Sequence, residues 1–482
     1  MYFLYRPPTF HRFLSLRLMS MADPQSLAVK RGGGDLCKPT AFLTFEDPQA
    51  FKVKSFGELI RALGVFRLCS FPLLVSNCNK LMSIARIVLG KRVFSMALRP
   101  SVYAQFVAGE TEGEIAESMQ KIASFGLHPM LAVPIEEDLG ESTGERRYED
   151  NLVAMLECVH MSHSKGWSKN PMMQLKITAL LRPELCVKLT SLLKTKQYDL
   201  NLLIRAMEGE QILFSGLSES ENAHFLCGLQ RLNKIGEASA NKVRVLVDAE
   251  YTYINPALSL ITMAMMKKFN QQSAWIWNTY QCYLKLRVSV QVKKRMICLQ
   301  ESRTLLLDAI QTSADQMFCL GVKLVRGAYM DKERNLAKKE ERTDPIHESW
   351  EKTNESYNGC LEIMLNLISE KPERYMIIVA THNEESVRRT VTRMLELGIN
   401  RDSSSVCFGQ LLGMCDHVSL TLAQHGFSVY KSVPYGTVDD TLPYLVRRAQ
   451  ENRTVLQGIR KERDLLRQEL RRRVREKITA AK

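Results

Sequence analysis

Eight short apolar runs, each closed by polar residues, alternate with longer helical stretches between about residue 129 and residue 449. Continuous apolar runs suit strands buried on both faces, and strands separated by helices pair in parallel. Eight such units over roughly 330 residues fit a closed barrel better than an open sheet. An open doubly wound sheet typically carries G-x-G-x-x-G after its first strand, and this sequence has none. We therefore expect an α/β chain with a (βα)8 TIM-type barrel. The runs occupy residues 130–139, 174–180, 243–250, 274–281, 321–329, 376–383, 405–411 and 427–434.

Helical patterns flank the predicted barrel on both sides. Residues 35–125 form a predicted helical region, because segments within it repeat apolar residues at intervals of three and four. The barrel is assigned to residues 126–455, and a strongly basic C-terminal helix to residues 456–482. This helix could lie on an acidic membrane surface or pack on the barrel as a solvated helix, and its pattern leaves both open. Its thin apolar stripe consists of Leu456, Ile459, Leu466 and Leu470.

The net charge of +14 is concentrated at the two ends of the chain. Residues 1–34 carry five Lys/Arg and one Asp, and residues 453–482 carry eleven Lys/Arg and four Asp/Glu. The 418 residues between them hold only the remaining +3. Because the body is nearly neutral and the basic ends lack interleaved aromatics, nucleic-acid binding is not predicted.

The first residues resemble a targeting segment. They contain three arginines, many hydrophobic residues and no acidic residue before Asp23. An Arg-rich, acid-free, amphipathic opening is typical of a mitochondrial presequence, so residues 1–34 are predicted to be one. The alternative is an N-terminus without a targeting role, in a protein that starts at Met19 or Met21.

Cysteine spacing and hydropathy restrict the class of protein further. The twelve cysteines include no C-x-x-C pair and no cluster at zinc spacing, which indicates reduced thiols in an intracellular compartment and no metal site. No window reaches eighteen apolar residues without a charge, so no transmembrane helix is predicted. The best candidate, "FPLLVSNC" at residues 71–78, is short and is interpreted as a buried helix.

One connection in the predicted barrel is unusually long. Residues 286–303, "LRVSVQVKKRMICLQESR", are basic and alternating where a helix is expected. They lengthen the link well beyond the usual few residues. The segment is either a surface insertion or an artefact of splicing or of the gene model, and the sequence does not decide between them.

Polar residues end several of the predicted strands. In a parallel barrel the active site lies at the carboxyl ends of the strands. A single strand-end aspartate more often caps a helix than it catalyses, and a single lysine in a strand often extends its amine to solvent. Their joint occurrence at successive strands nevertheless favours a site. The residues concerned are Lys176, Asp248, Glu250, Gln281, Arg326, Tyr329, Thr381, His382 and Asn383.

The last predicted barrel helix carries two adjacent arginines. Asp439 or Asp440 can cap this helix, with Pro443 in the first turn, where its missing N–H costs little. Two arginines projecting together can grip a carboxylate with planar hydrogen bonds, whereas a salt bridge to a nearby acid is the alternative. The residues that share one face at i, i+3, i+4 and i+7 are Tyr444, Arg447, Arg448 and Glu451.

Several longer motifs resemble the proline dehydrogenase family. They are "KLVRGAYMDKER", "VATHNEESV", "VCFGQLLGMCDHV" and "YLVRRAQEN", and "YAQFVAGET" resembles the helical N-terminal region of the family. The resemblance extends from about Ala41 to Leu470. It implies a distorted (βα)8 barrel that binds FAD and oxidises the ring C–N bond of a cyclic amino acid by hydride transfer. It also implies that electrons pass to ubiquinone at the mitochondrial inner membrane, on the matrix side.

The resemblance implies three groups of site residues, carried over by motif. The residues that hold the carboxylate and the ring of the substrate are Lys176, Tyr444, Arg447 and Arg448. The residues that line the reacting end are Asp248 and Tyr329. The residues on the flavin side are Gln281, Lys323, Arg326, Gly327, Thr381 and His382, with Glu451 supporting the arginine helix.

Ser432 departs from the pattern of the proline-specific members, which have tyrosine in the corresponding motif. A serine leaves space and offers a donor and an acceptor, as a 4-hydroxyl on the substrate ring requires. The chain therefore resembles the hydroxyproline-oxidising branch of the family, with the hydroxylated pyrroline carboxylate as product. The alternative is an L-proline dehydrogenase, in which Ser432 is a neutral variation. A second alternative, suggested only by residues 286–303, is a membrane-docking protein whose barrel no longer catalyses.

Overall fold

The structure is a computed structural model that describes residues 43–135, 144–195, 198–285, 302–454 and 456–480, excluding the side chains of residues 451–459. The predicted presequence lies outside these ranges, as does nearly all of the long connection at residues 286–303. The chain divides into two compact units, Met1–Leu43 and Thr44–Lys482, and the second contains every element described below.

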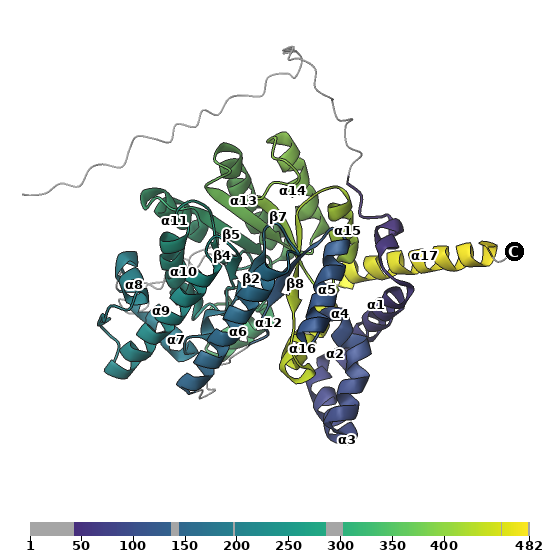
Figure 1. The fold of residues 1–482 in the computed structure, drawn as a ribbon, viewed down its shortest axis with the longest axis horizontal. Helices are drawn as coiled ribbons and strands as arrows, with labels where there is room; N and C mark the ends of the chain where they lie inside the picture. The colour runs from purple at the N-terminus through teal and green to yellow at the C-terminus, as the bar shows by residue number, and fades with distance from the viewer. Residues whose placement is uncertain (1–42, 136–143, 196–197, 286–301, 455, 481–482) are drawn as a thin grey trace, which may run out of the picture. The chain divides into compact units, whose positions relative to one another are not determined.

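Eight parallel strands form a closed barrel in the order of the sequence, which confirms the predicted fold (Figure 1). Each of the eight apolar runs supplies one strand. Strand β8 closes the barrel against β1, with Met130 paired to Ser432. The strands are β1 (His128–Ala132), β2 (Met172–Leu175), β3 (Arg244–Val247), β4 (Ile276–Gln281), β5 (Leu320–Val325), β6 (Tyr375–Ala380), β7 (Val406–Leu411) and β8 (Val429–Pro434).

Helices connect the strands and cover the outside of the barrel (Figure 1). Side-chain caps fix several of their starts; for example, Asn383 accepts a hydrogen bond from the backbone of Ser386 at the start of α14. The connecting helices are α6 (Glu145–Ser164), α7 (Pro183–Leu192), α8 (Leu200–Met207), α9 (Glu219–Ser239), α10 (Asn255–Phe269), α11 (Ser302–Asp315), α12 (Met330–Lys339), α13 (Trp350–Glu370), α14 (Glu384–Glu396) and α15 (Asp416–Gln424), with the 3₁₀ turn η3 (Ile177–Ala179) after β2.

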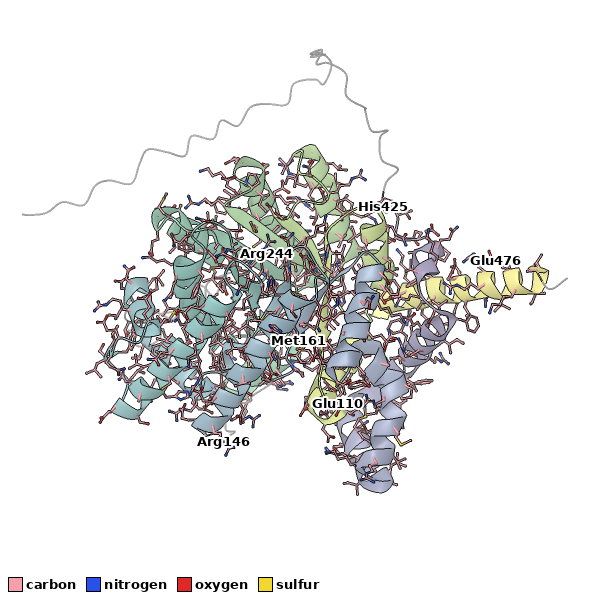
Figure 2. The ribbon with its side chains drawn as sticks, viewed as in Figure 1. Glu110, Arg146, Met161, Arg244, His425 and Glu476 are labelled. Carbon is pink, nitrogen blue, oxygen red and sulfur yellow. The ribbon has the colours of Figure 1, made fainter. Side chains whose placement is uncertain are left out.

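The barrel interior is apolar at the amino ends of its strands. Trp277 is fully buried there, and its indole Nε1 donates to the Ala274 carbonyl at 2.7 Å. A Cβ on Gly321 would lie 2.5 Å from the Trp277 ring, so glycine on the neighbouring strand makes room for the indole. Arg244, labelled in Figure 2, places its guanidinium 5.7 Å from the centre of that ring. The buried cluster comprises Met130, Met172, Leu246, Ala274, Trp277, Cys319, Met376, Ile378, Cys407 and Tyr430.

The same strands become polar toward their carboxyl ends. Side chains two residues apart on a strand share a face, so the positions that follow the apolar cluster also face the interior. On β2, for instance, Gln174 follows Met172, and on β8 Ser432 follows Tyr430. The sequence thus builds an apolar lower layer and a polar upper layer within one barrel.

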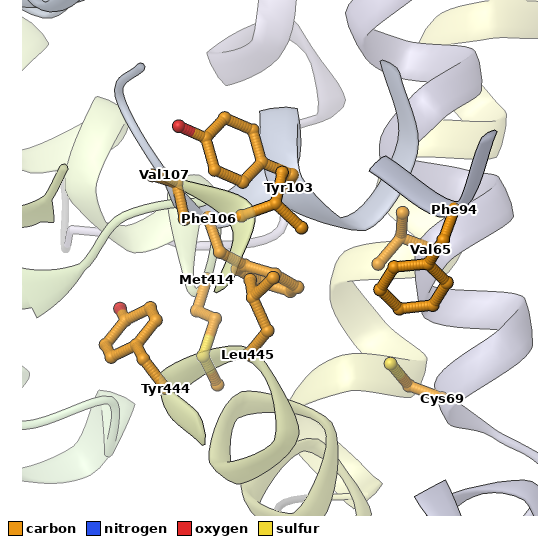
Figure 3. Packing of buried hydrophobic residues seen from close by; sticks show 10 residues of the cluster. Val65, Cys69, Phe94, Tyr103, Phe106, Val107, Met414, Tyr444 and Leu445 are labelled. Carbon is orange, nitrogen blue, oxygen red and sulfur yellow. The ribbon is translucent and has the colours of Figure 1, made fainter. Parts of the chain in front are cut away.

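Helices before the barrel pack on its last helix, α16 (Val438–Thr454). A capping box between Ser55 and Glu58 starts the first of them. Their buried side chains form one cluster with α16, in which Phe94 and Leu445 take part (Figure 3). The elements are η1 (Pro48–Val53), α1 (Phe56–Cys69), α2 (Pro72–Ser76), α3 (Cys78–Leu98), η2 (Arg99–Tyr103), α4 (Ala104–Phe106) and α5 (Glu112–Ser124).

The interpretation of residues 71–78 as a buried helix is wrong. Helix α2 does form there, but Leu73 is 79% exposed and Phe71 and Leu74 are exposed as well. Periodicity predicted the helix, whereas its burial depends on which neighbours cover it. Within the described ranges, every helix is too short or too polar to span a membrane.

The C-terminal helix α17 (Leu456–Ala480) packs against α1 and η1. Leu466 of its apolar stripe is almost fully buried, as is the neighbouring Leu465. Arg473 donates to backbone carbonyls of η1 and to that of Lys54. The structure shows this helix packed on the body of the protein, chiefly on the helices that precede the barrel, where the sequence suggested the barrel itself or a membrane surface.

Candidate active site

Helix α16 holds the two arginines close to the carboxyl ends of the strands. The predicted cap is wrong by two or three residues, because Thr437 precedes the helix and its Oγ1 accepts from the Asp440 N–H at 3.2 Å. Asp439 and Asp440 lie within the first turn, where their charges suit the positive end of the helix dipole. Pro443 lies inside the helix, at its sixth position.

Arg448 and Tyr444 contact each other on α16. The Arg448 guanidinium carbon lies 4.6 Å from the centre of the Tyr444 ring, and both side chains are buried. A cation held against an aromatic face keeps a fixed direction. Arg447 is half-buried on the same helix face. The side chain of Glu451, predicted to support these arginines, lies outside the described residues.

Lys176 lies one residue beyond β2, and not within the strand as the sequence suggested. It precedes the short turn η3. Its charge acts on Glu250, a buried carboxyl that accepts from Thr178 Oγ1 at 2.8 Å. Burial raises the pKa of Glu250 to about 6, and the positive Lys176 opposes that rise. Glu250 thus adds a second ionisable group to the predicted end of β3.

Asp248 and Lys323 form an ion pair at the carboxyl ends of β3 and β5. Lys323 Nζ lies 2.6 Å from Asp248 Oδ1, with the lysine buried and the aspartate half-buried. The resemblance placed Asp248 on the substrate side and Lys323 on the flavin side. Their contact therefore brings the two halves of the predicted site together.

Two polar atoms of the predicted flavin side are buried without a hydrogen-bond partner among the described residues. They are Oε1 of Gln281 and Nη2 of Arg326. Other atoms of the same side chains do have partners, since Gln281 Nε2 donates to the Glu250 carbonyl at 2.8 Å and Arg326 Nη1 to Ser386 Oγ at 2.9 Å. An orphaned buried acceptor and donor cost free energy unless a ligand or water satisfies them. The pair fits a planar group that offers both donors and acceptors, such as a flavin.

His382 follows β6 with its ring held by the backbone. The Leu411 N–H donates to His382 Nε2 at 3.2 Å, so this nitrogen carries no proton and the neutral ring is protonated at Nδ1. Burial, with the positive charges of Lys431 and Arg448, lowers the pKa of His382 to about 3. The ring is therefore a neutral donor at physiological pH. Thr381 beside it is buried, and its Oγ1 accepts from the Asn383 N–H at 3.0 Å.

Ser432 lies in the polar layer of the barrel interior. Its Oγ donates to Gln174 Oε1 at 2.8 Å, and its side chain is almost fully buried. The two residues come from β8 and β2, on either side of β1, where Ala132 is paired to Gln174.

The remaining predicted residues lie at the end of β5. Tyr329 packs its ring 4.6 Å from that of Tyr251, at an interplanar angle of 51°. Gly327 is exposed, and an added Cβ there would meet Met330 Sδ at 2.7 Å. The structure thus places Tyr329 on the β3 side of the site, beside the connection that follows Glu250.

Two residues near the site were not recognised as site residues from the sequence. Gln174 stands inside an apolar run, and only the barrel register brings it to Ser432. Lys431 is fully buried, and its Nζ lies 2.7 Å from Asp416 Oδ1. A lysine in an apolar strand was the available signal for Lys431, as it was for Lys176.

Comparisons with known proteins identify the family of this chain. A family model described as "Proline dehydrogenase" matches residues 116–461. The chain is 55% identical over 438 residues to "Hydroxyproline dehydrogenase" of Xenopus laevis, covering 90% of each chain. It is 32% identical over 566 residues to "Proline dehydrogenase 1, mitochondrial" of Drosophila melanogaster, covering 90% of this chain and 81% of that one.

A solved structure shows the same fold. Proline utilization A (PutA) from Bdellovibrio bacteriovorus, inactivated by N-propargylglycine, superposes with a TM-score of 0.56 at 17% identity. The match covers 85% of this chain and 36% of that chain, so this chain spans about a third of the longer protein. From the family match and the identity to its relatives, the chain belongs to the proline dehydrogenase family.

Proposed function

We propose that this protein is an FAD-dependent dehydrogenase that oxidises trans-4-hydroxy-L-proline to 1-pyrroline-3-hydroxy-5-carboxylate. The observation that carries the choice of substrate is the hydrogen bond between Ser432 and Gln174 in the polar layer of the barrel. It supplies a hydroxyl and an amide where a tyrosine would fill the space. The higher identity to the relative named for hydroxyproline supports the same choice.

The cationic residues suit the carboxylate of an amino acid. Arg447 and Arg448 project from one face of α16, and Lys176 extends from the end of β2. Charge-assisted, planar hydrogen bonds from arginine fix both the position and the orientation of a carboxylate. The ring of Tyr444, held by Arg448, would then border the substrate ring.

Oxidation of the ring requires loss of a proton from nitrogen and of a hydride from the neighbouring carbon. The flavin accepts the hydride when it is bound. The substrate amine must be neutral before that carbon can release hydride, so a group or water must take its proton. The resemblance places Asp248 at the reacting end, where its side chain forms an ion pair with Lys323. Asp248 would therefore attract the substrate ammonium and receive its proton directly or through water.

The flavin would contact the orphaned polar atoms described above. Gln281 Oε1 can accept from it, and Arg326 Nη2 can donate to it. Lys323, Thr381 and His382 complete the polar surroundings, and the positive groups would favour an anionic reduced flavin. Family members depend on flavin in general, and FAD is the form we propose for this chain.

The electron acceptor and the location follow from the family. We propose ubiquinone as the acceptor, at the matrix side of the mitochondrial inner membrane. Residues 1–34 carry five Lys/Arg and no acidic residue before Asp23, and this composition supports mitochondrial import. A relative whose printed name includes "mitochondrial" supports it as well.

Steady-state kinetics with a soluble dye as acceptor would test the substrate. We expect kcat/KM to be higher for trans-4-hydroxy-L-proline than for L-proline, with some proline oxidation remaining. A pocket that gains only a little space discriminates by about 1–3 kcal/mol. A higher kcat/KM for L-proline would contradict the proposal and favour an L-proline dehydrogenase.

A further inference from the structure

An exposed apolar surface lies on the helices that precede the barrel. Of the 23 large hydrophobic side chains found exposed in the described ranges, eleven fall within residues 68–96, on and around α2 and α3. Monomeric proteins rarely leave such residues clustered at their surface without a partner. We call this the α2–α3 surface. Its most exposed side chains are Leu73, Ile84, Ile87, Val88, Val93 and Met96.

Helix α3 is apolar on both of its sides. Met82 and Ala85 are partly buried and pack against the cluster shared with α16. Leu81, Ile84 and Val88, spaced three and four residues apart, form a second stripe that is exposed. A helix that only covered the barrel would carry polar residues at these outer positions.

Gly90 divides α3 close to its most exposed residues. Its φ of 70° and ψ of 158° lie outside the helical region, so the element consists of two helical segments that meet there. Ile87 and Val88 before this break are 82% and 75% exposed, and Met96 after it is 72% exposed. Hydrophobic side chains thus project on both sides of the bend.

The segment of chain that carries this surface has basic residues but no acidic residue of its own. Between Glu58 and Glu110 the sequence has seven Lys/Arg and no acidic residue. Lys80 and Arg92 are exposed on α3, and neither forms an ion pair with any residue in the described ranges. Basic side chains interleaved with exposed aliphatic ones suit a surface that is both negatively charged and apolar.

We propose that the α2–α3 surface docks on an anionic lipid bilayer. A helix that binds at a membrane surface inserts apolar side chains between the headgroups and the acyl chains, and its basic side chains contact the anionic headgroups. Helix α3 supplies side chains of both kinds. A protein partner of ordinary composition could cover the apolar residues. It would not supply the negative charge that a basic stretch of this length, without acidic residues, calls for. Helix α17 is more basic, but among its described side chains Leu465 and Leu466 are buried, and its exposed large hydrophobic residues are Val474 and Ile478 alone, against eleven on the α2–α3 surface.

Docking by this surface would also bring the active-site helix close to the membrane. Arg86 and Lys91 of α3 both pair with Asp439 on α16, at 3.1 and 2.7 Å. The buried cluster that includes Tyr444 joins the same two helices. This consequence rests on the proposed function, because only an acceptor dissolved in the bilayer gives the enzyme a reason to dock there.

Vesicle sedimentation with the full chain tests the proposal without turnover. The probes are vesicles of phosphatidylcholine alone and of phosphatidylcholine with phosphatidylglycerol. We expect binding to the anionic vesicles, and a loss of at least about tenfold in Ile87→Asp with Val88→Asp, because both side chains leave the acyl boundary. Lys80→Gln with Arg92→Gln should weaken binding by about fivefold for each charge removed.

Two matched variants serve as controls. Leu213→Asp changes a side chain that is 83% exposed but lies between α8 and α9, and it should bind like the wild type. Arg471→Gln with Arg475→Gln removes two exposed charges from α17 and should also leave binding unchanged. Dye-linked turnover of every variant should match the wild type, which separates docking from the proposed reaction.

Several results would overturn the proposal. They are absence of binding to either vesicle, equal binding to both, and loss of binding in the α17 variant with retention in the Ile87 and Val88 variant. A concentration-dependent dimer without lipid that Ile87→Asp dissociates would assign the surface to a second copy of the chain.

Discussion

The two layers of the barrel interior differ in chemistry although they are built on the same eight strands. The lower layer is an apolar cluster around Trp277. The upper layer contains Gln174, Ser432 and the ion pair of Asp248 with Lys323. The lower layer therefore contributes mainly to stability, and the upper layer gives up apolar packing for groups that can bind and react.

Truncating the lower layer should give the largest effect. Trp277→Ala removes a fully buried indole and its hydrogen bond to Ala274, and we expect unfolding to become easier by about 3–5 kcal/mol. Denaturant titration measures this change. The kcat per folded molecule should stay near that of the wild type. A severe loss of turnover with unchanged stability would contradict the division between the layers.

Removing one arginine from α16 should weaken substrate binding. Arg448→Met should lower kcat/KM roughly ten- to 150-fold. This factor corresponds to about 1.5–3 kcal/mol of lost transition-state stabilisation, because a hydrogen bond to a charged group is lost. Steady-state kinetics with hydroxyproline would show it mainly as a higher KM. Arg389→Met, at an exposed arginine of α14, is the matched control. If both variants behaved alike, Arg448 would not bind the substrate.

Filling the space at Ser432 should change the preference between substrates. Ser432→Tyr should lower the ratio of kcat/KM for hydroxyproline to that for proline, because the tyrosine ring would displace the substrate hydroxyl. The expected change corresponds to about 1–3 kcal/mol of discrimination between the two substrates. Gln174→Leu should lower the ratio in the same direction by removing the partner of Ser432. A ratio that neither substitution changes would remove the basis for choosing hydroxyproline.

The buried Glu250 should give the smallest effect, in the pH dependence of stability. Its folded pKa of about 6 lies above its usual 4.5, so the folded state holds the proton more tightly than the unfolded state. Stability should therefore fall as pH rises from about 4.5 to about 6, by about 1–2 kcal/mol. Glu250→Gln has no carboxyl group to titrate. The difference in unfolding free energy between this variant and the wild type should therefore change over the same pH range. A difference independent of pH would show that Glu250 has an ordinary pKa.

The sequence predicted the barrel because each strand is a local pattern. The polar residues at the ends of β3, β5 and β6 were predictable for the same reason. Gln174 was not, because its meeting with Ser432 joins residues 258 positions apart in the chain. The exposure of Leu73 was mispredicted, because periodicity identifies an apolar face but not whether another element covers it.

An anaerobic absorbance titration of the purified protein measures flavin content and substrate preference together. We expect a flavin band that hydroxyproline removes at a lower concentration than proline does. A colourless protein, or a band that proline removes at the lower concentration, would contradict it.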